Sequence, residues 1–82
     1  MNNSSETTLD KLLPNQKARV MAISNQLDRV ARLRLMDLGF VPNSLVEVSL
    51  VSPMNRPKAY LIRGSLIVLR DQQASFISIK LI

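Results

Sequence analysis

Residues 32–44 combine an apolar helical face, a glycine stop and a proline turn directly before a strand pattern. Leu35 and Leu38 lie three residues apart on one helical face, and Gly39 can adopt the left-handed conformation that ends a helix. Pro42 then prevents the helix from resuming. The alternation of apolar residues at 45–51 predicts a strand. This order of signals indicates a folded module rather than a site of chemistry.

Similar patterns along the chain predict about five short antiparallel strands joined by tight turns, at residues 17–24, 45–51, 59–63, 66–70 and 75–81. The segment 66–70 is apolar on both faces, so we expect it to lie in the centre of the sheet. Single helical turns are expected at residues 8–13 and 71–74, beside one main helix that runs to Leu38. The prediction is a mainly β protein, a small and partly closed barrel that limits its exposed edges.

The length of 82 residues bounds the chain to one small domain with a single core. The polar residues 1–7 are expected to be a flexible N-terminus, and residues 8–82 to form the domain. The chain has no cysteine, no apolar signal segment and no apolar run near the roughly 20 residues of a membrane helix. We therefore expect a cytoplasmic protein, with a monomer as the default because no signal specifies self-association.

Eleven basic residues against six acidic ones give a net charge of +5. This excess favours acidic partners, nucleic acid or an anionic membrane surface. The basic residues are scattered, however, and a solvated surface explains them equally simply. A small basic barrel that binds nucleic acid is the rival hypothesis, weakened because only Phe40, Tyr60 and Phe76 could stack on bases and two of these occupy expected core positions.

Catalysis and metal binding find little support in the residue types. The chain has no histidine or cysteine to act as a base, nucleophile or metal ligand near neutral pH. Its carboxylates fall in different elements, and its four methionines suit the filling of gaps in a core. We predict a non-enzyme with no catalytic, cofactor-binding or metal-binding residue, and no small-molecule substrate.

The main helix has more apolar residues than one core-facing stripe requires. At about 100° per residue, one side carries Ala31, Leu35 and Leu38. The other side is a candidate protein-docking surface, with two arginines at its rim: Arg29, Val30, Arg32, Leu33 and Met36. The alternative is that the helical turn at residues 8–13 folds back over this side and buries it.

The ordered set of motifs resembles the FeoA family, small cytoplasmic partners of the bacterial ferrous-iron transporter FeoB. The resemblance runs from about residue 9 to residue 79. Its parts are Leu9, Leu12, Pro14, Lys17 to Val20, Arg32-Leu33, Asp37 to Pro42, Val46, Val48, Pro53, Pro57, Ile62-Arg63-Gly64, Leu69-Arg70, Ala74 and Ile77. No single part is decisive, but the ordered set is specific.

The resemblance implies an SH3-like barrel with helical additions. It implies an accessory protein of ferrous iron uptake that binds and modulates the FeoB membrane GTPase, and that reaches the inner face of the membrane only through this partner. One mechanism left open is an arginine supplied in trans to the GTPase by Arg29, Arg32 or Arg34, and the simpler alternative is a solvated helix surface. A third hypothesis is a detached SH3-like regulatory module of the kind found in metal-dependent repressors.

Asparagines replace glycines that the family usually carries in turns. Because asparagine tolerates positive φ, we expect left-handed conformations at Asn15, Asn43 and Asn55. Gly39 and Gly64 are the only glycines, and we expect them where even a Cβ atom is unwelcome. Together with Pro42, these residues are the predicted structural turns.

Overall fold

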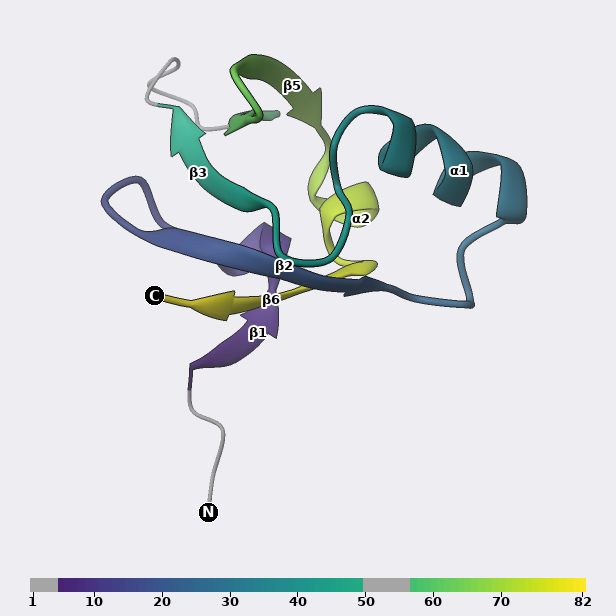
Figure 1. Cartoon of the computed structure of the whole chain (residues 1–82), viewed down its shortest axis with the longest axis horizontal. Helices are drawn as coiled ribbons and strands as arrows, with labels where there is room; N and C mark the ends of the chain where they lie inside the picture. Colours follow the sequence, from purple (N-terminus) through teal and green to yellow (C-terminus); the bar gives the residue numbers. More distant parts are fainter. Residues whose placement is uncertain (1–4, 50–56) are drawn as a thin grey trace.

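The computed structural model describes residues 5–49 and 57–82, and this part of the chain is mainly β (Figure 1). Six antiparallel strands form one sheet in the order β1-β6-β2-β3-β4-β5. They are β1 (Glu6–Thr8), β2 (Lys17–Ile23), β3 (Leu45–Ser49), β4 (Lys58–Ile62), β5 (Ser65–Leu69) and β6 (Ile77–Leu81). The helical elements are the 3₁₀ turn η1 (Leu9–Lys11), α1 (Arg29–Asp37) and α2 (Asp71–Ala74). No helix within these ranges is long and apolar enough to cross a membrane.

The inner face of the curved sheet builds the core. Alternate residues of the strands are buried, as in Val46 and Val48 of β3 and Ile77 and Ile79 of β6, so the period-two pattern of the sequence becomes one apolar surface. The largest fully buried side chains are Tyr60, Phe40, Leu9, Leu12, Ile62, Ile77, Ile79, Val20 and Val46. The mainly β prediction is thus confirmed, and the core lies between the sheet, η1 and the chain that follows α1.

The sheet contains a strand at the N-terminus that the sequence analysis did not predict. Glu6, Thr7 and Thr8 pair with Lys80, Ile79 and Ser78 of β6, and the N–H of Leu81 donates to the carbonyl of Ser5 at 2.7 Å. Residues 6 and 7 therefore belong to the folded domain rather than to a flexible terminus. Polar residues suffice here because β1 is an edge strand, held by its backbone hydrogen bonds.

The position of β5 corrects a second expectation. This strand lies at the end of the sheet, not in its centre. A two-residue turn at Arg63 and Gly64 pairs β5 with β4, and α2 then carries the chain away to β6, which pairs with β1 and β2 instead. Apolar residues on both faces of the strand were therefore not a sign of burial on both faces.

The turn residues follow the expectations only in part. Asn43 has a φ of 76°, and its N–H donates to the carbonyl of Val20 at 2.8 Å. Asn15 lies in a turn, but its φ is not positive, which corrects the prediction. The N–H of Gln16 donates to the carbonyl of Leu13 at 3.0 Å, so Pro14 and Asn15 are the central residues of a type I-like turn, which needs no positive φ. Asn55 and residues 50–51 of the predicted strand lie outside the described residues.

Both glycines have positive φ, but the space around them differs. A Cβ on Gly39, at φ 116°, would lie 3.0 Å from Cδ of Arg63, as expected for a crowded position. A Cβ on Gly64, at φ 81°, would meet nothing within 4 Å, so the expected crowding is absent there. Arg63 itself has a φ of 52°, and Arg63 and Gly64 together form the left-handed turn that joins closely twisted antiparallel strands.

Candidate protein-docking surface

Local signals at both ends fix the position of α1. The Asp28 carboxylate accepts a hydrogen bond from the N–H of Ala31 at 3.2 Å and caps the first turn. At the other end, the N–H of Phe40 donates to the carbonyl of Leu35 and the N–H of Gly39 to that of Met36, each at 3.0 Å. These two bonds form the motif that ends helices with a left-handed glycine. Phe40 and Leu35 are both buried, so the end of α1 is anchored in the core.

One side of α1 packs against the domain and the other remains open. Leu35 is buried and Ala31 is half-buried, whereas Val30 is 60%, Leu33 47% and Met36 41% exposed. We call Val30, Leu33 and Met36 the α1 patch. The helical turn at residues 8–13 does not cover it, because the leucines at positions 9 and 12 are fully buried in the barrel core.

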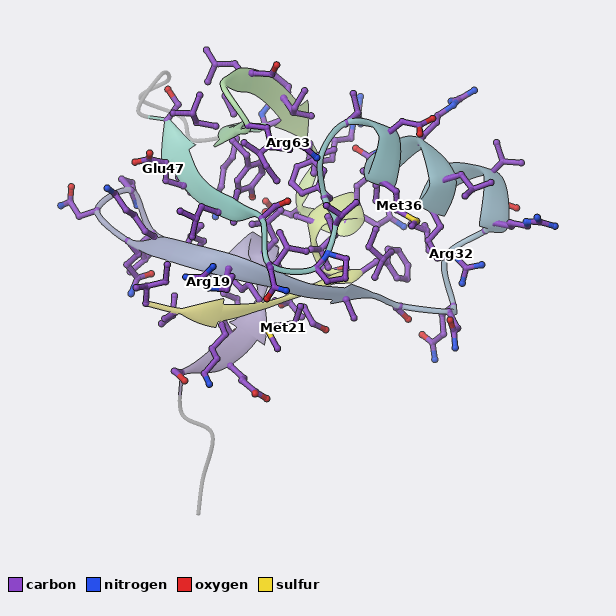
Figure 2. All side chains as sticks on the ribbon, viewed as in Figure 1. Arg19, Met21, Arg32, Met36, Glu47 and Arg63 are labelled. Carbon is purple, nitrogen blue, oxygen red and sulfur yellow. The ribbon has the colours of Figure 1, made fainter. Side chains whose placement is uncertain are left out.

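The two predicted rim arginines differ in their surroundings. Arg29 is exposed, whereas Arg32 is half-buried and its Nη1 donates to Oδ1 of Asn25 at 3.0 Å. Figure 2 shows Arg32 and Met36 on the same side of the helix. The hydrogen bond to Asn25 holds Arg32 beside the apolar side chains. Of the five predicted docking residues, four are thus exposed and Arg32 is half-buried.

Leu38 differs from the expected arrangement. We placed it on the core side with Ala31 and Leu35, but it is exposed. Leu38 is the C-cap residue, one position beyond α1, where the chain leaves the helix toward Gly39. Its backbone is still helical, with φ −77° and ψ −10°, so periodicity gives the direction of its side chain but does not determine whether that part of the helix is covered.

The ionisable groups of the described residues form no metal-ligand cluster. No group of three or more carboxylates comes together there as metal ligands. Tyr60 lies in the core, where burial raises the pKa of its hydroxyl well above the usual range, and the carboxylates of Asp71 and Asp10 add to the rise. Its hydroxyl donates to the carbonyl of Leu9 at 3.5 Å, so the buried phenol fills the core and stays protonated.

Aromatic side chains are not available for base stacking on this surface. Phe40 and Tyr60 are fully buried and Phe76 is half-buried. A nucleic-acid interface of the barrel would therefore have to depend on charge alone. The exposed apolar helix side is the more distinctive feature, and it suits a protein partner.

A sequence model of the FeoA domain family matches residues 7–81 of the chain. No curated protein sequence matches it. Among solved structures, the FeoA protein from Chlorobium tepidum is 26% identical with a TM-score of 0.81, and the match covers 93% of this chain and 70% of that one.

Two more distant structures share the fold. The match to FeoA from Stenotrophomonas maltophilia, described as a prokaryotic SH3 domain protein complexed with zinc, covers 90% of this chain and 89% of that one at 22% identity and a TM-score of 0.79. IdeR from T. acidophilum is 20% identical with a TM-score of 0.78, and the match spans all of this chain but 37% of that one. The barrel described above is accordingly SH3-like.

Proposed function

The chain belongs to the FeoA family, whose members are linked to ferrous iron transport, and we propose that it binds a FeoB-type membrane GTPase through α1 and modulates its transport of ferrous iron. The observation that carries this proposal is the α1 patch. Three large apolar side chains remain exposed on a helix that is capped at both ends, in a domain small enough to need its apolar residues for its core. In this proposal the protein is a non-enzymatic cytoplasmic accessory, recruited to the membrane by its partner.

The composition of the surface supports a protein partner. Methionine at position 36 is flexible and adapts to irregular apolar pockets. Leu33 lies between Val30 and Met36 along the exposed side, where a central apolar residue contributes most to binding. Arg29 and Arg32 at the rim steer an acidic partner and accelerate its association more than they strengthen the final complex.

The test is an NMR titration of labelled protein with the purified soluble GTPase domain of the transporter, with and without nucleotide. We expect amide shifts to cluster on residues 29–37. The variant Leu33→Lys should fold normally and weaken binding about tenfold or more, because a charge would enter the centre of the interface. Leu13→Lys is the matched control, since Leu13 is equally apolar and exposed but lies outside α1. Unchanged binding by Leu33→Lys, or shifts confined to the sheet, would contradict the proposal.

One observation keeps a second candidate in view. The chain shares its fold with part of IdeR, which is consistent with an SH3-like regulatory module of a metal-dependent repressor acting on its own. This alternative predicts binding to a separate DNA-binding chain rather than to the transporter. The same labelled protein, titrated with such a repressor lacking its own SH3-like domain, distinguishes the two.

A further inference from the structure

The outer edge of β5 is a free strand edge within the part of the chain that the structure describes. Within the described residues β5 pairs with β4 alone, and no loop hydrogen bond reaches its other side. Natural sheets usually protect such an edge with charged residues, proline or a bulge. The sequence of β5, from Ser65 to Leu69, has no charge and no proline, and its register with β4 is unbroken.

The pairing with β4 determines which backbone groups face the free edge. Ile62 and Ser65 close the two-residue turn and so form a hydrogen-bonded pair. Hydrogen-bonded pairs alternate along antiparallel strands, so Ile67 and Leu69 also direct their N–H and carbonyl groups toward β4. Leu66 and Val68 therefore direct theirs outward, where another strand could pair with them.

The side chains of the same two residues are exposed. Leu66 is 58% and Val68 59% exposed on the outer face of the sheet. Leu61 of β4 lies directly across from Leu66, and it is exposed as well. The free backbone groups and the apolar side chains thus coincide at one edge.

We propose that this edge binds a second copy of the chain, with the two β5 strands antiparallel and centred on Ile67. In this register Leu66 of each copy lies opposite Val68 of the other, and both residues offer their outward hydrogen-bonding groups, so the two sheets become one continuous sheet. The proposal replaces the default expectation of a monomer at high protein concentration. It is independent of the α1 patch and of the transporter.

The charges around β5 favour a second copy over an acidic or basic partner. The exposed outward residues of β4 and β5 are Leu61, Leu66 and Val68, and none is charged, so the surface suits an equally uncharged strand. The chain itself supplies one.

The first experiment is light scattering or sedimentation of the full chain across a range of concentrations. One pair of short strands buries less than a standard interface, so we expect a dissociation constant on the order of 0.1–1 mM. Val68→Lys should abolish the dimer, because a charge on each copy would face Leu66 of the other. Leu45→Lys should leave it intact, because Leu45 is 53% exposed on the same face of the sheet but lies on β3, away from the edge.

Single cysteines test the register, since the chain has none of its own. Residues opposite each other in a hydrogen-bonded antiparallel pair have Cα atoms about 5.5 Å apart, within the range of a disulfide. A mixture of Leu66→Cys and Val68→Cys chains should therefore cross-link faster than either variant alone. Leu45→Cys is the control that measures cross-linking by random collision.

Two results would overturn the proposal. The first is a wild-type chain with no detectable dimer at about 1 mM, where a dissociation constant at the upper end of the expected range would still place about half of the chains in dimers. The second is equal cross-linking by all cysteine combinations. If the chain stayed monomeric and Val68→Lys instead weakened binding to the transporter domain, the edge would belong to that partner. Loss of the dimer alone would leave the α1 proposal intact, because that proposal is tested by Leu33→Lys.

Discussion

Replacement of Gly39 by alanine should destabilise the domain by about 2 kcal/mol. The residue has a φ of 116°, which L-amino acids rarely adopt, and the backbone strain is worth about 1–3 kcal/mol. The Cβ would lie 3.0 Å from Cδ of Arg63, and the flexible arginine can move away at a small further loss. Alanine also lowers the conformational entropy of the unfolded chain, which offsets about 0.4–1 kcal/mol of this loss of stability.

Gly64→Ala is the matched comparison. Its φ is 81° and a Cβ there meets nothing within 4 Å, so only the backbone strain remains and the loss should be nearer 1 kcal/mol. A domain of 82 residues has a total stability of roughly 4–12 kcal/mol, so both variants should still fold. For Gly39→Ala the midpoint of thermal unfolding should fall by about 10 °C.

The assay is urea unfolding followed by circular dichroism, with equal m-values as the sign that only stability has changed. The double variant Gly39→Ala with Arg63→Ala separates the contact from the strain, because removing Cδ relieves the contact and leaves φ unchanged. A loss of stability below about 0.5 kcal/mol for Gly39→Ala would refute the argument that φ and crowding combine at this position. A loss for Gly64→Ala as large as that for Gly39→Ala would refute it as well.

Two further predictions concern stability. Because burial raises the pKa of Tyr60, the folded state favours the neutral phenol. The contribution of Tyr60 to the free energy of unfolding is fully present below the pKa of about 10 that a tyrosine has in the unfolded chain, and it should fall as the pH rises above that value. The prediction is checked by the phenolate absorbance of this single tyrosine and by denaturation measured at several alkaline pH values. Tyr60→Phe should flatten the dependence of the free energy of unfolding on pH. The same dependence in Tyr60→Phe as in the wild type would contradict the prediction. Asp28→Ala removes the cap of α1 and should lower the stability measured by thermal unfolding by about 1 kcal/mol. Asp28→Asn should keep most of the capping stabilisation, because an asparagine side chain can accept the same hydrogen bond. Equal losses in the two variants would argue against capping.

Local sequence signals predicted the parts of the fold that depend on neighbouring residues. The stop at Gly39 and the strand alternation act over a few positions, and the structure follows them closely. The edge position of β5 and the existence of β1 depend on which strands meet across long connections. Their own residues do not encode that choice, so a strand apolar on both faces was wrongly placed in the centre.

The candidate docking surface was predictable to a similar degree. Helical periodicity placed Val30, Leu33 and Met36 on one side of α1, but it could not decide whether the side is covered. That depends on where the leucines of residues 8–13 pack, which is a long-range question. The edge of β5 was missed altogether, although its uncharged sequence was visible, because an edge is recognised only from the strand order.

The last strand along the chain lies inside the sheet, between the first two strands (Figure 1). Residues 77–81 must therefore be present before β1 has a partner and before the barrel core can close over Ile77 and Ile79. During synthesis, the hairpin of β4 and β5 can form early from local contacts, whereas the barrel as a whole must wait for β6. Until β6 is available, β5 and the apolar inner faces stay exposed together, so the chain is most prone to associate with other copies at this stage.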